Sequence, residues 1–447
     1  MKVISHIICI LFLSVNVFAS DENKLPESER YFLSGIFECY QDQLTTFIHQ
    51  EVEKYPNLVV YTDDPLLTDT RNFIEYVLTP IDITVTAKRA YHTNKLLMLR
   101  SLINQIDVLH GYSDVFNFLG ELSTWMYTGV DLIADEMAFV SSYLPESIFE
   151  DDSKDVSTLI LEAQEQLKSL PEFGGRLRSS GKDSHLKGDL PSLLFDYDQT
   201  RIIRTPTVIK DPEWEKTMAG EHPEIAEEFK QFLRYYAGQG KTHLYVNLSE
   251  NNSKEGHECR IISELETDPT VQDAVIVVRL DRNSPFYRQE DPIDLMNADV
   301  FMAEFTDELM NPSHYNWSRR LVMTEWTETL QILLSEVHYG YFQAKPELTL
   351  EERLAFIDMV HLKIVTILMD RFHPDTANIS SSCSNNRSPS FYSVLFFYVL
   401  GPKSELSFEQ RKQMVTLLFA PGMLVKNSPL ASERVDRLPG IIHLLSK

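Results

Sequence analysis

A cysteine and an arginine stand close together in a short polar segment. Residues 378–389 read Asn-Ile-Ser-Ser-Ser-Cys-Ser-Asn-Asn-Arg-Ser-Pro, so that three residues separate Cys383 from Arg387. Backbone amides and a helix N-terminus can lower the pKa of a thiol in such a place, and the resulting thiolate can attack a phosphate ester. An arginine can bind two phosphate oxygens with its paired N–H groups. The pair therefore indicates cysteine-dependent phosphate chemistry.

This chemistry requires a loop between a strand and a helix. A β-prone stretch precedes Cys383, and the apolar run 391–400 that follows Arg387 favours a helix. Loops that close around one tetrahedral anion have about five residues between cysteine and arginine, because the backbone must surround the phosphate oxygens. Here the spacing is shorter by two. An ordinary loop cysteine with no role in chemistry is the alternative.

Several segments together resemble a known group of proteins. They are residues 243–248, 277–289, 336–338, 348–357 and 382–383. With these segments the chain resembles bacterial proteins that carry a Ser-Cys-Lys-x-x-x-Asp-Arg loop and that are similar to inositide-type phosphatases of the Cys-x5-Arg class, secreted effectors among them. The resemblance covers roughly residues 240–400. It implies that Cys383 is the nucleophile, Arg387 the phosphate-binding residue and Asp281 the general acid.

The loop departs from the pattern of that group at four places. Ser384 replaces the lysine, two loop residues are missing, and Asn386 replaces the acidic residue before the arginine. Ser388 and Pro389 follow where two glycines are expected. A shortened loop cannot present the same ring of backbone amides to a phosphate. We therefore expect a phosphatase-like domain whose activity is weak or lost, and whether it is an enzyme stays open.

The elements that position this loop belong to the second half of the chain. Alternating or continuous apolar residues predict strands at 243–248 and 274–280, and the helix-length stretch between them predicts a parallel pair. Helices are expected at 294–310, 324–338 and 350–371. The last begins with Thr349 and Glu352 at the spacing of a capping box.

The first half of the chain has helical periodicity. Leu96, Leu99, Ile103 and Ile106 recur at three and four residues, and Gly111 follows. We expect a signal peptide at 1–20, a helical domain at 21–170, a Gly/Ser-rich basic linker or loop at 171–192 and an α/β domain at 193–447. The predicted fold class is mixed α and α/β, a helix-rich N-terminal bundle followed by a phosphatase-like α/β domain.

Other motifs carry no comparable signal. Gly240, Lys241 and Thr242 precede a strand, whereas a phosphate-binding loop follows one. The sequence contains no Gly-x-Ser-x-Gly, His-Glu-x-x-His or Cys-x-x-Cys. His338 and His361 fit the faces of predicted helices better than a zinc site. We therefore expect neither a metal nor a cofactor.

Charge and cysteine content restrict the partners. The formal net charge of −25 opposes general attraction to nucleic acid or to an anionic membrane. An anionic ligand must therefore be held locally, and a phosphorylated small molecule or lipid headgroup fits the predicted loop. The alternative function is that of a secreted, non-catalytic helical protein that binds a protein partner. Beyond the signal, Cys39, Cys259 and Cys383 are an odd number and predict no disulfide scaffold.

The N-terminus has the pattern of a secretory signal. Lys2 is followed by the apolar run 7–13 and by small residues around Ala19, and no later segment is long and apolar enough to predict a membrane span. We expect export, with the periplasm, the medium or a host cell as the destination.

The first testable prediction concerns this segment. Protein recovered after export should begin at Ser20 or Asp21, because the small residues at the end of the apolar run suit a signal peptidase. N-terminal sequencing of the exported protein measures this directly. Exported material that still begins at Met1 would show that the segment is not removed.

Overall fold

The structure is a computed structural model that describes most of the chain after the predicted signal. The described residues are 27–79, 85–107, 109, 111–150, 154–169, 190–210, 224–250, 254–290, 293–381, 387–401, 406–426 and 435–447, and their side chains are described except at 27–34, 85–90, 254–257 and 425–426. The predicted signal peptide and most of the predicted linker lie outside these ranges, so those expectations stay predictions.

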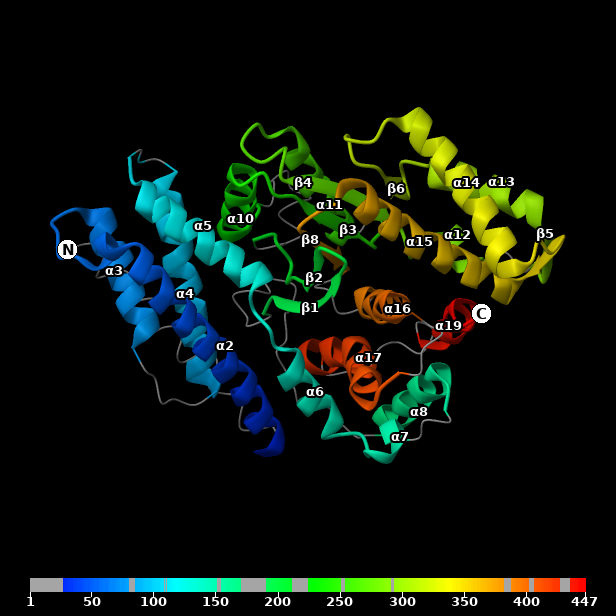
Figure 1. Ribbon diagram of the computed structural model, residues 1–447, viewed down its shortest axis with the longest axis horizontal. Coiled ribbons are helices and arrows are strands. Elements are labelled where there is room, and N and C mark those ends of the chain that lie inside the picture. The colour runs from blue at the N-terminus through cyan, green and yellow to red at the C-terminus, as the bar shows by residue number, and fades with distance from the viewer. Residues whose placement is uncertain are drawn as a thin grey trace.

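A six-stranded mixed sheet lies at the centre of the molecule (Figure 1). Its strands, in spatial order, are β1 (Ser192–Tyr197), β2 (Thr200–Arg204), β8 (Thr376–Ser380), β3 (His243–Asn247), β4 (Val275–Leu280) and β6 (Tyr315–Asn316). The four inner strands β2, β8, β3 and β4 are parallel, whereas β1 and β6 pair antiparallel at the two edges. The fold is therefore mixed α and β, with a parallel centre.

Three of the inner strands, β3, β4 and β8, are fully buried because both faces of the sheet are covered. Tyr245 of β3 and Val277 of β4 belong to a cluster with the aromatic side chains of α10 (Glu227–Gly238) and with α11 (Lys254–Glu264). Leu244 and Val246 face the larger core, which includes α15 (Leu350–Phe372) and α16 (Ser388–Leu400). Parallel strands buried on both faces are expected to be continuous apolar runs.

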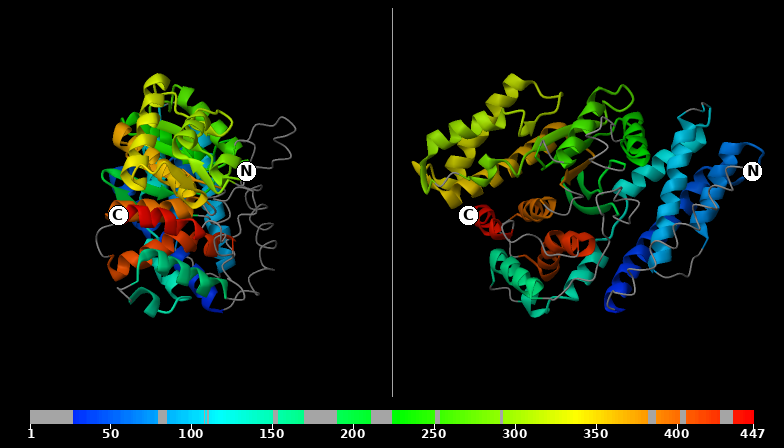
Figure 2. Two further views of the ribbon diagram at one scale, coloured as in Figure 1. Left: turned by 90° about the vertical axis from the view of Figure 1, so that its right-hand side faces the viewer. Right: turned by 180° about the vertical axis from the view of Figure 1, so that it is seen from behind.

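The helices before the sheet pack in two places. The first group packs together on one side and contacts α10 and, through α5, strands β1 and β2 (Figure 1): α2 (Glu27–Lys54), α3 (Pro65–Leu78), α4 (Val85–Ile106) and α5 (Ser113–Thr128). The second group packs instead against helices from the C-terminal end of the chain, as both views of Figure 2 show. It comprises α6 (Ile133–Ser141), α7 (Ser147–Glu150) and α8 (Val156–Lys168), which contact α17 (Phe408–Pro421) and α19 (Leu438–Leu445).

The remaining elements complete the C-terminal half and one helical connection. They are η2 (Pro56–Val59), η3 (Leu265–Thr267), α12 (Pro285–Arg288), β5 (Leu295–Asn297), α13 (Ala298–Leu309), α14 (Met323–Phe342), β7 (Glu347–Thr349) and the π-helical turn η4 (Gly422–Lys426). Strands β5 and β7 form a separate antiparallel pair. None of the helices in the described part of the chain is long and apolar enough to cross a membrane.

Several sequence predictions are confirmed. Strands β3 and β4 pair in parallel with α11 between them. The capping box at the start of α15 is present, since Thr349 Oγ accepts the Glu352 N–H at 3.2 Å and the Glu352 carboxylate accepts the Thr349 N–H at 3.0 Å. The helix expected before Gly111 ends earlier, at Ile106, and Gly111 has a φ of 104°. The hairpin of β1 and β2 was not predicted.

A cluster of titratable side chains joins the N-terminal helices to α10. Lys54 Nζ contacts the carboxylates of Glu51 at 2.6 Å and Glu121 at 2.9 Å. The hydroxyls of Tyr55 and Tyr235 donate to the same oxygen of Glu121 at 2.9 and 3.0 Å. The Glu121 carboxylate therefore accepts several hydrogen bonds. Glu51 is only 2% exposed, and one oxygen of its carboxylate has no hydrogen bond.

The two carboxyl groups consequently titrate apart. Burial and the neighbouring Glu121 raise the pKa of Glu51 to about 7. Burial also acts to raise the pKa of Glu121, but hydrogen bonds from its neighbours outweigh burial and lower that pKa to about 2. In the folded protein Glu51 therefore holds its proton between about pH 4.5 and 7, where an unfolded chain has lost it. Folded stability contributed by this group falls as the pH rises through that range.

The variant Glu51→Gln tests this coupling. Glutamine cannot ionise, so the variant should match the wild type near pH 5 and should be more stable by about 1–2 kcal/mol near pH 8. Thermal unfolding followed by circular dichroism across this pH range measures the difference. Glu53→Gln, at an exposed position on the same helix, is the matched control and should show no such pH dependence. Equal behaviour of the two variants would contradict the prediction.

Candidate functional site

The loop with Cys383 connects the end of one inner strand to the start of a helix. Strand β8 ends at Ser380, and α16 begins at Ser388. Arg387 is the residue before that helix. Cys383 is one of residues 382–386, which lie outside the described ranges. The expected succession of strand, loop and helix is nevertheless present on both sides of the loop.

Ser381 holds the two ends of this loop together. Its Oγ, which is buried, accepts the N–H groups of Arg387 and Ser388, each at 2.8 Å. The Ser388 hydroxyl also donates to the same oxygen at 2.8 Å. The described residues on either side of 382–386 therefore meet at the carboxyl end of β8.

The same contacts use up much of the N-terminus of α16. The Ser388 N–H, the first of the helix, is bonded to Ser381, and Pro389, the second residue, has no N–H. Helix N-termini bind anions through such amides. Within the first two positions of α16 no amide is therefore available to an anion. This arrangement limits how well the site could bind phosphate through the helix.

Arg387 is buried at the carboxyl edge of the sheet. The residue is 7% exposed, and its Nη1 donates to Ser249 Oγ at 2.9 Å. Ser249 follows β3, and its own N–H donates to the Asn247 side chain at 2.9 Å. A guanidinium is thus held between the ends of β3 and β8. The contact with Ser249 was not predicted, because a single serine after a strand carries no signal in the sequence.

Asp281 lies in the same region, directly after β4. Its carboxylate accepts the Asn283 N–H at 2.8 Å, and the residue is 1% exposed. Burial raises the pKa of Asp281, and the hydrogen bond from the Asn283 N–H, followed by the electrostatic influence of His314 and Arg387, partly opposes this rise. The structure therefore brings two predicted site residues, Asp281 and Arg387, within electrostatic reach of each other. In open α/β sheets ligands bind at this edge, where the parallel strands end.

A buried ionic network supports the segment after Asp281. The carboxylate of Asp358, on α15, accepts from Arg282 Nη2 at 2.5 Å, from Arg437 Nε at 3.0 Å and from the Tyr287 hydroxyl at 2.9 Å. Burial acts to raise the pKa of Asp358, but the two arginines outweigh it and lower the pKa to about 2. The guanidinium of Arg282 also lies 5.5 Å from the ring of Phe391, on α16.

This network was missed at the sequence level. The signal that could have found it is an acidic residue inside an apolar helical stripe, since Asp358 stands between Ile357 and Met359. A carboxylate there is buried and needs cationic partners. Those partners come from positions more than 70 residues away in both directions, and the spacing of residues along the chain does not identify them.

The histidines and the other described cysteines have structural environments. His338 Nε2 contacts the Lys345 carbonyl at 2.8 Å, and His361 Nε2 contacts the Tyr315 hydroxyl at 2.9 Å. Burial raises the pKa of Cys259 to about 12, which disfavours the reactive thiolate. In the ranges that the structure describes, no three His, Cys, Asp or Glu side chains are grouped so that they could hold a metal ion.

Comparisons with protein-family models, with curated proteins and with solved structures find no match for this chain.

The variant Asp358→Ala tests the network behind the site. It leaves the buried guanidinium of Arg282 and the partly buried guanidinium of Arg437 without their shared carboxylate, and we expect a loss of about 3–5 kcal/mol of stability. The midpoint of urea denaturation measures the loss. Asp370→Ala, at an exposed position on the same helix, removes one hydrogen bond to Tyr197 and should cost less than about 1 kcal/mol. Equal midpoints for the two variants would show that the network contributes little.

Proposed function

We propose that this chain is an exported, phosphatase-like protein that binds a phosphate ester at the carboxyl edge of its sheet. The observation that carries the proposal is the buried Arg387 at the end of a loop between β8 and α16, next to the ends of β3 and β4. A guanidinium there can form two parallel hydrogen bonds with a phosphate group. The resemblance to inositide-type phosphatases favours a phosphorylated small molecule or a lipid headgroup as the ligand.

Each predicted residue has a chemical task in this proposal. Arg387 neutralises the anion. Burial raises the pKa of Asp281, and in its protonated form Asp281 can donate a proton to a leaving oxygen. The thiolate of Cys383 would form a covalent bond to phosphorus as the bond from phosphorus to the ester oxygen breaks, and water would then release phosphate from sulfur.

The same site also supports the expectation of weak activity. A phosphorus atom in transfer carries developing charge on its equatorial oxygens, and that charge requires several convergent donors. Ser381 occupies the first amides around α16, and Pro389 provides none. We therefore propose that the site still binds a phosphate ester but hydrolyses it slowly or not at all.

A non-catalytic interaction protein is the second candidate. Exposed apolar side chains on the outer face of α14 favour it, since Ile332 is 58% exposed and Tyr339 is 71% exposed. The two residues are seven positions apart and so lie on one face of the helix. Such a face suits contact with another protein more than with a phosphate ester.

The variants Arg387→Ala and Cys383→Ser separate the readings. We expect weak, saturable binding of inositol hexakisphosphate by the mature protein, reduced at least about tenfold in Arg387→Ala, because the variant removes a charged, bidentate donor. Isothermal titration calorimetry measures this. Any turnover of p-nitrophenyl phosphate should disappear in Cys383→Ser, while binding persists.

Arg371→Ala is the matched control, because Arg371 is exposed on α15 and pairs with Glu325 at 3.5 Å. It should bind the probe as the wild type does. Vesicles that contain a phosphoinositide, tested beside the free inositol phosphate, distinguish a lipid headgroup from a soluble ligand. If the wild type binds neither probe, or if Arg387→Ala binds as tightly as the wild type, the phosphate site is wrong and the interaction protein is favoured.

A further inference from the structure

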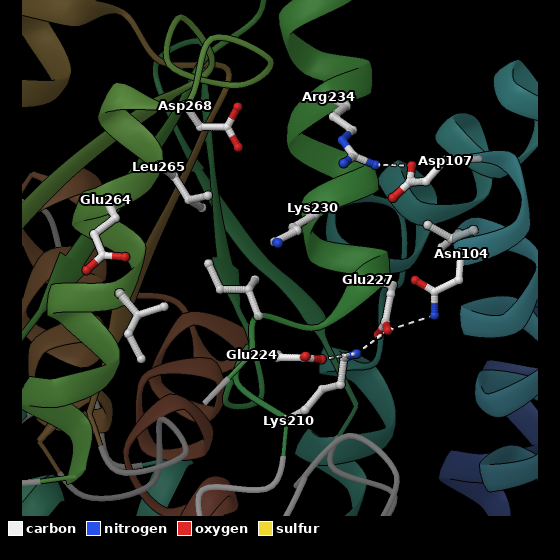
Figure 3. Close-up of a pocket in the computed structure, with 13 residues that line it drawn as sticks. Asn104, Asp107, Lys210, Glu224, Glu227, Lys230, Arg234, Glu264, Leu265 and Asp268 are labelled. Atoms are coloured by element: carbon white, nitrogen blue, oxygen red, sulfur yellow. Dashed lines mark hydrogen bonds and ion pairs between the residues drawn. The ribbon is translucent and has the colours of Figure 1, made fainter. Parts of the chain in front are cut away.

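A pocket without Arg387 in its lining lies beside α10, between α4 and α11. It has a volume of about 550 Å³ and is lined by α4, α10, α11, η3 and the residues around the bridge of Ile209 and Ile225 (Figure 3). This volume is typical of sites for small molecules. None of the residues predicted from the sequence to act on phosphate lines it.

One wall of the pocket consists of ion pairs that neutralise one another. Arg234 pairs with Asp107, and Lys210 pairs with both Glu224, at 3.1 Å, and Glu227. The Asn104 amide also donates to Glu227 at 3.0 Å. Figure 3 shows these contacts as dashed lines on one side of the pocket. The wall is built by helices from two different parts of the chain and is held in place by these contacts.

The other charges of the pocket face each other across open space. Lys230, on α10, points into the pocket, and Glu264 and Asp268 lie on the opposite side (Figure 3). Among the described residues no carboxylate is within 4.0 Å of the Lys230 ammonium, and no cation is that close to Glu264 or Asp268. Asp268 is nevertheless influenced by Lys230: hydrogen bonds from Thr270 first, and then the charges of Arg234 and Lys230, lower its pKa.

The lining also has an excess of acid and an apolar part. Five lining side chains are acidic and three are basic. Two carboxylates and one ammonium are therefore left over once the paired wall is set aside. Ile261 and Leu265 lie on the same side as Glu264, and aliphatic carbon atoms of a ligand can pack against them. A ligand that matches this lining has one carboxylate, two cationic groups and an aliphatic chain.

We propose that this pocket binds a basic amino acid, free or at the end of a short peptide. The ligand carboxylate pairs with Lys230, its α-ammonium group pairs with Asp268, and its distal cationic group pairs with Glu264. Its methylene groups pack on Ile261 and Leu265. Each ligand charge thus meets an opposite charge that has no ion-pair partner in the described structure, and the net charge of −25 attracts a cationic ligand from a distance.

Three related ligands test the proposal on the mature protein. L-lysine has all the required groups, cadaverine lacks the carboxylate, and Nε-acetyl-lysine lacks the distal charge. At about 150 mM salt, which screens general attraction to the acidic chain, L-lysine should bind saturably. Cadaverine and Nε-acetyl-lysine should each bind at least about tenfold more weakly, a difference of about 1.4 kcal/mol. The dipeptide Gly-Lys, tested beside L-lysine, shows whether the free amino acid or a peptide end is preferred.

Two variants locate the binding. Lys230→Gln should bind L-lysine no better than cadaverine, because only the carboxylate distinguishes these ligands. Glu264→Gln should lose the preference for L-lysine over Nε-acetyl-lysine. Both positions are at least partly exposed and make no side-chain ion pair in the described structure, so the variants should fold. Lys168→Gln, on α8, is the control and should bind as the wild type does.

The outcomes decide the proposal independently of the phosphate site. Binding of L-lysine that is unchanged in Arg387→Ala but lost in Lys230→Gln supports it. Absence of saturable binding by L-lysine and Gly-Lys up to roughly 10 mM, where a millimolar Kd would already show saturation, overturns it. Equal affinity for L-lysine and cadaverine in the wild type, or unchanged binding in Lys230→Gln, overturns it as well.

Discussion

Four parallel strands covered on both faces leave only their ends for polar chemistry. Along β3, β4 and β8 every side chain is buried, so a charged group within a strand would lose its water without gaining space for a ligand. Beyond the last residue of each strand this restriction ends. Ser249, Asp281 and Arg387 all occupy that position, each after a different strand or loop. The grouping of residues far apart in sequence is thus a consequence of parallel pairing.

Buried ion pairs connect the layers around this sheet. Arg100 on α4 makes two hydrogen bonds to Glu228 on α10, at 2.6 and 2.7 Å, and Arg204 of β2 pairs with Glu136 on α6. Each pair joins a helix that precedes the sheet to an element of the sheet region. Such pairs contribute little net stability over apolar packing, but removing one partner leaves a buried charge. They therefore restrict how these elements can be arranged more than they strengthen the fold.

Elements whose apolar residues follow one clear pattern could be predicted from the sequence. The segment of β3 has alternating apolar residues, that of β4 is an almost continuous apolar run, and α15 begins with a capping box, so each element could be predicted from its own residues. Strand β8 could not, because Thr376, Asn378 and Ser380 are polar. In the structure Thr376 and Asn378 bond to the ring of His243 on β3, at 2.8 and 2.9 Å. Polar residues in this strand are satisfied by a neighbour that no local pattern identifies.

The candidate site was predictable in its charged residues but not in their surroundings. The close spacing of a cysteine and an arginine in a polar segment suggested Arg387, and the family resemblance suggested Asp281. Ser381 carried no signal, although its hydroxyl has the largest consequence for chemistry. By accepting two amides at the start of α16 it closes the loop, and it also occupies donors that an anion would need.

Under the proposed function, most of the affinity for an anion comes from the side chain of Arg387. A helix N-terminus with free amides adds about 0.3–1 kcal/mol for each nearby negative charge, and here Ser381 and Pro389 remove the first of those donors. The guanidinium of Arg387, fixed by Ser249 at 2.9 Å, is a charged donor at this edge of the sheet. A lysine could supply the charge but not the planar pair of N–H groups. Under the proposed function, we therefore expect phosphate binding to depend on the identity of this residue more than on the length of the loop.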